Sequence, residues 1–157
     1  MMRPTMMRPG RHRLWRAQDG VGAIEFAVVA GILCILLLGI VDFGIGFWEK
    51  MEVGTAARAG AEYAAKNPYD STKIQAAVTN ATSLSSVLAS PAPAQTCGCP
   101  DATTGITAAT CGAACPNGDL AGTFVTVNAQ ASYRTIFGWP GISNPMTLAS
   151  SVTVRTN

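Results

Sequence analysis

The sequence predicts an α+β protein in which a long N-terminal transmembrane helix continues into an exported helix. A second helix and a small antiparallel β-hairpin or sheet head with a disulfide-stapled loop complete the predicted fold. Three observations support it: an apolar run from Val21 to Trp48, an Ala-rich stretch up to Lys66, and alternating apolar and polar residues from Val125. At 157 residues, the chain holds a membrane segment and at most one small domain.

The apolar run holds one carboxylate close to its start. Every residue from 26 to 41 is apolar or Gly, and Glu25 directly precedes that stretch. Val21–Trp48 is longer than the about 20 apolar residues that a helix needs to cross a bilayer, and a secretory signal peptide has a shorter apolar core. A charge is costly at membrane depth, so Glu25 is a candidate functional residue. Asp42 is expected near the outer membrane boundary, where a charge costs little.

The charges are segregated along the chain. Basic residues that flank a span favour the cytoplasm, so the N-terminus is expected inside and the remainder exported. The span accounts for the basic cluster, and no nucleic acid is expected as a partner. We therefore divide the chain into a basic cytoplasmic leader (1–20), a transmembrane helix (21–48), an exported helical segment with a linker (49–94), and a cysteine loop with a β-rich head (95–157). The arginines before the apolar run are Arg3, Arg8, Arg11, Arg13 and Arg16.

Helical signals continue beyond the span. The Ala-rich stretch should end at Asn67-Pro68, because the residue before Pro avoids helical dihedrals. Asp70 can then cap a second helix from Ser71 to Leu88, whose apolar stripe is expected to lie on the first helix. Small residues recur every four positions in both parts of the first helix, which indicates either close helix packing or ordinary Ala/Gly enrichment. The candidate helix-packing residues are Ala23, Ala27, Gly31, Gly39, Ala57, Gly60 and Ala61.

Four cysteines cluster after a Pro-rich linker, in a predicted loop that ends near Leu120. Clustered cysteines in an exported segment indicate disulfides. Two crosswise pairings of Cys97 and Cys99 with Cys111 and Cys115 are favoured, and the sequence does not choose between them. The spacing does not match a zinc site, so neither a metal nor a cofactor is expected. Cys34 is expected to be a small buried apolar residue.

The last third of the chain changes to a period of two. Residues 125–134 and 148–155 alternate between apolar and polar, as half-buried strands do. Gly138-Trp139-Pro140-Gly141 supplies a turn between them. An antiparallel pair packed against the outer helix is the expected arrangement.

The N-terminal half resembles the TadE-like family of tight-adherence (Flp) pilus assembly proteins, which are pseudopilins or minor pilins. The resemblance rests on Gly20 before the span, Glu25-Phe26-Ala27-Val28 at its start, Gly39–Gly44 with Asp42 at its end, and Ala56–Ala61 in the outer helix. These motifs occur in the expected order and cover residues 20–65.

The resemblance implies a non-enzymatic assembly protein of the bacterial inner membrane. A prepilin peptidase would cut between Gly20 and Val21, which leaves Glu25 as the fifth residue, before Phe26. A cut after Gly22 would make Glu25 the third residue and is the less favoured choice. The implied partners are the lipid bilayer, the peptidase, other pilins or pseudopilins, and the tight-adherence secretion machinery. Glu25 would meet the free amine of a neighbouring subunit, which offsets the cost of burying either charge.

Two alternatives from other functional classes remain open. The chain could be an uncleaved single-pass anchor that presents a small extracytoplasmic binding domain. It could also be a membrane-tethered thiol–disulfide protein that acts through Cys97 and Cys99, since closely spaced cysteines can have perturbed thiol chemistry.

Overall fold

The structure is a computed structural model that describes residues 19–101, 103 and 105–156. The arginines of the basic leader lie outside the described residues. The chain divides into two compact units, the first ending at Gly39 and the second beginning at Ile40.

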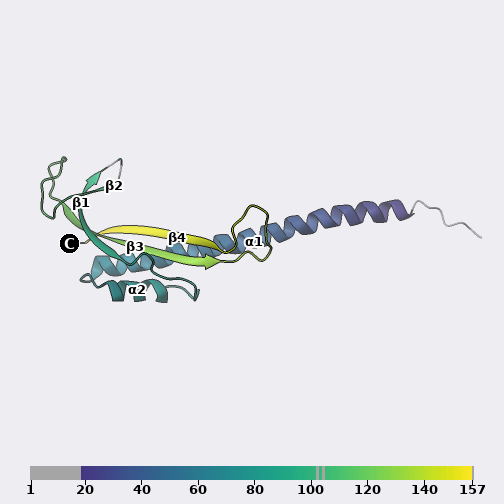
Figure 1. The fold of residues 1–157 in the computed structure, drawn as a ribbon, viewed down its shortest axis with the longest axis horizontal. Helices are drawn as coiled ribbons and strands as arrows, with labels where there is room; N and C mark the ends of the chain where they lie inside the picture. Colours follow the sequence, from purple (N-terminus) through teal and green to yellow (C-terminus); the bar gives the residue numbers. More distant parts are fainter. Residues whose placement is uncertain (1–18, 102, 104, 157) are drawn as a thin grey trace, which may run out of the picture. The chain divides into compact units, whose positions relative to one another are not determined.

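The predicted long helix is confirmed as α1, which runs over Asp19–Lys66 and is 48 residues long (Figure 1). It ends where the sequence indicates, because Asn67 still donates its N–H to the carbonyl of Tyr63 but Pro68 cannot continue the pattern. The apolar run and the Ala-rich stretch are therefore one continuous helix.

The second helix is shorter than expected. Helix α2 covers Ser71–Asn80, and the predicted cap is confirmed because Asp70 Oδ1 accepts from the N–H groups of Thr72 (3.0 Å) and Lys73 (3.2 Å). The expected continuation to Leu88 is wrong. Thr82 engages the Glu52 carboxylate and the N–H of Leu84 instead, which is how such hydroxyls compete with helical bonding.

The segment after α2 joins the sheet rather than the helix face. Leu88 exchanges two backbone hydrogen bonds of 2.8 Å with Gln130, and its side chain is exposed. The buried face of α2 is formed by Ile74 and Val78 and does not reach Leu88.

The predicted strand pair is confirmed and belongs to a four-stranded antiparallel sheet with the order β2-β1-β3-β4. Strands β3 (Gly122–Tyr133) and β4 (Met146–Thr156) pair along their whole length, from Thr123 opposite Thr156 to Tyr133 opposite Met146.

Strands β1 (Ala94–Asp101) and β2 (Gly105–Ala108) replace the first part of the expected cysteine loop. Cys97 and Cys99 therefore lie in a strand. Only glycine fits between them, because a Cβ at Gly98 would be 2.5 Å from Ile106 Cγ2 and 2.7 Å from the Thr107 carbonyl oxygen.

Two disulfides fix the loop after β2 to strand β1. They join Cys97 to Cys111 and Cys99 to Cys115, one of the two crosswise arrangements that the sequence left open. The expected burial of Cys34 is wrong for the chain by itself, because Cys34 is exposed on α1 and forms no disulfide.

The core of the second unit lies where α1, α2 and β3 meet (Figure 1). Ala57 and Ala61 are buried there, and a Cβ on Gly60 would be 2.5 Å from Val78 Cγ2. This small-residue row therefore packs inside the head. The core residues are Val53, Ala56, Ala57, Ala61, Ala64, Ile74, Val78, Val87, Val125, Val127, Ala129, Ala131, Tyr133 and Leu148.

Candidate functional site

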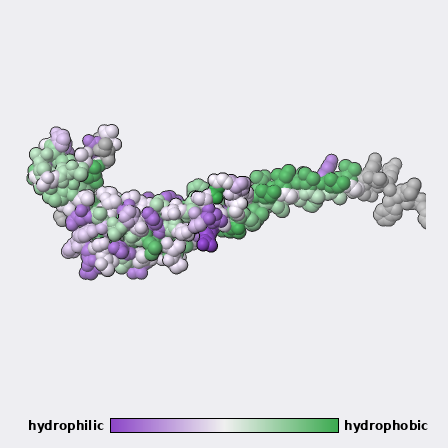
Figure 2. All heavy atoms as spheres, viewed as in Figure 1, coloured by the Kyte–Doolittle hydropathy of each residue, from purple (hydrophilic) through white to green (hydrophobic). Residues whose placement is uncertain are grey.

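The N-terminal part of α1 exposes large apolar side chains on all sides. Ile24 is 69 % exposed, Phe26 75 % and Leu36 61 %, and Figure 2 shows this part of the helix as a mainly apolar surface with one hydrophilic patch. The helix is long and apolar enough to cross a membrane. Exposed apolar surface of this extent marks a membrane or protein contact.

The expected processing residues lie in the first two turns of this helix. Gly20, Val21, Glu25 and Phe26 are all exposed. Among the described residues, no hydrogen bond or ion pair involves the carboxylate of Glu25. Within the part of the chain that the structure describes, this charge therefore has no internal partner.

The small residues of the span are equally available. Ala23, Ala27 and Gly31 are exposed, and a Cβ on Gly31 would meet nothing within 4 Å. Gly39 is half-buried. The two rows of small residues therefore differ in burial. The outer row (Ala57, Gly60 and Ala61) is buried in the core, whereas these three residues are exposed.

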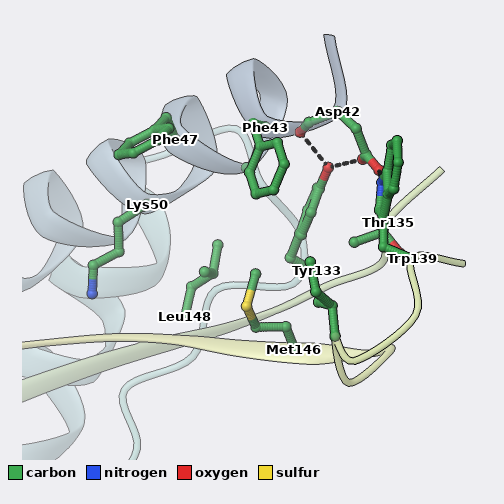
Figure 3. Close-up of a pocket in the computed structure, with 11 residues that line it drawn as sticks. Asp42, Phe43, Phe47, Lys50, Tyr133, Thr135, Trp139, Met146 and Leu148 are labelled. Carbon is green, nitrogen blue, oxygen red and sulfur yellow. Dashed lines mark hydrogen bonds between the residues drawn. The ribbon is translucent and has the colours of Figure 1, made fainter. Parts of the chain in front are cut away.

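A buried carboxylate lies at the start of the second unit. The Tyr133 hydroxyl lies 2.6 Å from Asp42 Oδ1 and 2.8 Å from the Asp42 carbonyl oxygen (Figure 3). The Ile136 N–H donates to the same Oδ1 at 3.1 Å, and Trp139 Nε1 donates to Oδ2 at 2.7 Å. Three donors thus converge on one side chain, which we call the Asp42 cluster.

The end of β3 and the loop behind it build the Asp42 cluster. Tyr133 is the last residue of β3, and the loop then folds back through a turn closed by the Ile142 N–H and the Trp139 carbonyl. The side-chain amide of Asn144 also donates to the Thr135 carbonyl at 3.4 Å. This loop brings an indole N–H and a backbone N–H to a helix that is far away in sequence.

The expectation that Asp42 sits where a charge costs little is wrong. Asp42 is only 2 % exposed and is the one buried polar or charged residue among those described. Burial of a carboxylate is costly unless hydrogen bonds replace its hydration, and bonds to a charged group are about twice as strong as neutral ones. The Asp42 cluster meets this requirement and fastens the loop to α1.

An apolar cavity of about 340 Å³ opens beside the Asp42 cluster (Figure 3). Its wall is almost entirely apolar, because the oxygens of Asp42 are engaged by their donors. Lys50 contributes its stem, while its ammonium donates to the carbonyl of Ala149. The lining residues are Asp42, Phe43, Gly46, Phe47, Lys50, Tyr133, Thr135, Trp139, Ile142, Met146 and Leu148.

Tyr133 gives the Asp42 cluster a measurable signature. Burial, reinforced by the hydrogen bond to Asp42, raises the pKa of Tyr133 to about 12. An unfolded tyrosine ionises near pH 10, so the stability that this group contributes is complete below pH 10 and is lost as the pH rises from about 10 to about 12. We expect the phenolate absorbance that Tyr133→Phe removes to appear near pH 12. If Tyr133→Phe instead removed a phenolate component that appears near pH 10, the burial of Tyr133 beside Asp42 would be contradicted.

The described residues hold no group of three or more His, Cys, Asp or Glu side chains that could bind a metal ion. The four cysteines of the head are consumed in two disulfides, of which Cys99–Cys115 is buried on both sides. These disulfides attach the loop between β2 and β3 to strand β1.

The fold and the site define a protein with an N-terminal membrane-anchoring helix and a disulfide-bonded α+β head. The family model described as TadE-like protein matches residues 20–62, which confirms the resemblance over that range. The match covers the exposed apolar helix, Glu25, Asp42 and most of the outer helix. It supports involvement in tight-adherence pilus assembly and fits a membrane location. No curated protein and no solved structure matches the chain.

Proposed function

We propose that this protein is a minor pilin or pseudopilin of a tight-adherence pilus, inserted in the bacterial inner membrane and processed after Gly20. The observation that carries the proposal is the matched segment 20–62, in which an apolar helix exposes the carboxylate of Glu25 close to its start, with no partner among the described residues. Such a residue at membrane depth is expected to find a partner.

Processing would supply that partner. A cut between Gly20 and Val21 creates a free α-amine about one helical turn from Glu25. In an assembled fibre, the amine of one subunit can lie against the carboxylate of its neighbour. Because an unpaired charge is unfavourable in an apolar setting, this pairing makes release from the bilayer dependent on assembly.

The other parts of the structure support a structural role. The uncovered row Ala23, Ala27 and Gly31 allows close approach of a neighbouring helix. The disulfides suit an oxidising compartment, which supports a head outside the cytoplasm. The basic leader supports an N-terminus inside it. The partners are the prepilin peptidase, other pilins or pseudopilins, and the tight-adherence secretion machinery.

The test is the N-terminus of the protein recovered from membranes, with and without a co-expressed prepilin peptidase. We expect a peptidase-dependent N-terminus at Val21, seen by intact mass and N-terminal sequencing. Gly20→Leu should abolish processing, because the peptidase must accommodate the residue before the cut. The matched variant Gly22→Leu should still be cut after Gly20.

Two outcomes would contradict the proposal. Loss of processing in Gly22→Leu but not in Gly20→Leu would show that the peptidase cuts after Gly22. Glu25 would then be the third residue of the processed chain. An N-terminus that the peptidase never changes would leave an uncleaved anchor with an extracytoplasmic head. If processing occurs, Glu25→Gln should still be cut but should fail to enter fibres, which immunoblotting of sheared pili would show.

A further inference from the structure

We propose that the apolar cavity beside the Asp42 cluster holds one acyl chain of a bilayer phospholipid. The proposal rests on the membrane location of α1 and does not require the pilus role. It assigns a ligand class to a cavity that assembly through the N-terminal helix leaves unused.

The chemistry of the wall selects an alkyl chain. The cavity measures about 340 Å³, within the about 300–1,000 Å³ typical of small-molecule sites. Ligand pockets usually place a few polar groups to orient their ligand, whereas this wall presents almost none. A polar or charged ligand would therefore lose its hydration without replacement.

The position of the cavity along α1 indicates that the acyl chain comes from a bilayer lipid. Residues 21–41 form the uninterrupted apolar part of the helix apart from Glu25, and at about 1.5 Å per residue they span the about 30 Å of a bilayer core. The first residue lining the cavity is Asp42, directly after Val41. Because the apolar run continues to Trp48, the cavity lies beside the outer end of the predicted span, where an acyl chain of the outer leaflet can reach it.

The exposed side chains at the mouth form a path from this level outward. Phe43 is 56 % exposed and Phe47 is 70 % exposed, one helical turn apart on the same face as Lys50 (Figure 3). Aromatic residues favour the membrane interface. A chain that runs along these rings places its headgroup phosphate near the ammonium of Lys50, in the orientation of an outer-leaflet lipid.

The first test measures contact between Trp139, which lines the cavity, and lipid chains. In a Trp15→Phe/Trp48→Phe background, Trp139 is the one remaining tryptophan of the sequence. The full chain is placed in nanodiscs of phosphatidylethanolamine and phosphatidylglycerol with brominated acyl chains. We expect at least a twofold loss of Trp139 fluorescence relative to unbrominated lipid. Unchanged fluorescence would overturn the proposal without any cavity variant.

The second test fills the cavity. Met146→Trp adds an indole to the lining, while Met51→Trp makes the same change at an exposed position of α1 outside the cavity. After exchange into detergent, native mass spectrometry should find about one phospholipid per chain in the natural protein and in Met51→Trp, and at least fivefold less in Met146→Trp.

The results separate this proposal from its rivals. Equal lipid content in both variants would overturn it. A loss of self-association in Met146→Trp without a change in lipid content would assign the cavity to a side chain of a second copy and would also overturn it. Neither assay uses the peptidase or the fibre, so failure of the pilus role would leave these outcomes unaffected.

Discussion

Asp42→Ala is expected to lower the free energy of unfolding of the head by about 3 kcal/mol. The substitution removes the acceptor of the Tyr133 hydroxyl, the Ile136 N–H and the Trp139 indole N–H. A buried donor that loses its partner costs about 1–3 kcal/mol, and part of the loss is recovered where water reaches the loop. The effect should be measured on the full chain in nanodiscs, by thermal unfolding followed with near-UV circular dichroism.

Asp70→Ala is the matched control in the same unit. Asp70 accepts two backbone N–H groups at the N-terminus of α2 and is more exposed than Asp42. Loss of such a cap costs about 1 kcal/mol. Hydrogen exchange should add a local signature, since Asp42→Ala should raise the exchange of the Ile136 amide more than Asp70→Ala does. Equal destabilisation by the two variants would contradict the role assigned to Asp42.

Gly60→Ala is expected to destabilise the head by about 1–3 kcal/mol, although alanine is the better helix former. The added Cβ would lie 2.5 Å from Val78 Cγ2 and 2.8 Å from Val127 Cγ1. Both valines are fully buried, and their branched side chains have few rotamers to which they can move. The overlap therefore has to be relieved by separation of α1 from α2 or from β3.

Gly54→Ala makes the same substitution in α1 at a position where the added Cβ overlaps no neighbouring atom. A Cβ at Gly54 would have Ser150 Oγ as its nearest neighbour, at 4.0 Å. The helix propensity of alanine should then stabilise the chain by up to about 1 kcal/mol. Urea titration of the two variants under one condition gives the comparison. A stabilised Gly60→Ala would show that α1 does not pack closely against α2 and β3.

The features that were predictable from sequence are those set by local pattern. The apolar run and Ala-rich stretch gave α1 and its end at Lys66, and the period of two gave β3 and β4 with small boundary shifts. The disulfide partners were limited to two arrangements because neighbouring cysteines bridge poorly. In each case the controlling interactions lie within a few residues or repeat at a fixed period.

The features that were missed depend on tertiary contacts. β1 carries Cys-Gly-Cys-Pro, which has no alternating pattern, and it becomes a strand through pairing with β3. From the sequence alone, Asp42 has the character of a charge at the membrane interface. Its burial depends on Trp139, which donates to it from 97 residues away. A polar residue at the end of an apolar run, together with a later Trp in a turn, was the available signal.

The small outer residues of α1 illustrate the same limit. Spacing alone could not decide whether Ala57, Gly60 and Ala61 face another subunit or the chain itself. The decision depended on α2 and β3, which supply the surfaces that cover them.

Because α1 supplies both the anchor and part of the hydrophobic core, the head has no separable stalk. Val53, Ala57 and Ala64 are core residues that precede every strand in the chain. A protease that cuts between Val53 and Ala64 would divide the core residues of α1 between two fragments and leave no intact domain to diffuse away. Such a protein cannot be shed from its membrane in working form by a cut in that segment, and a fragment that keeps every described contact of the head has to include Asp42.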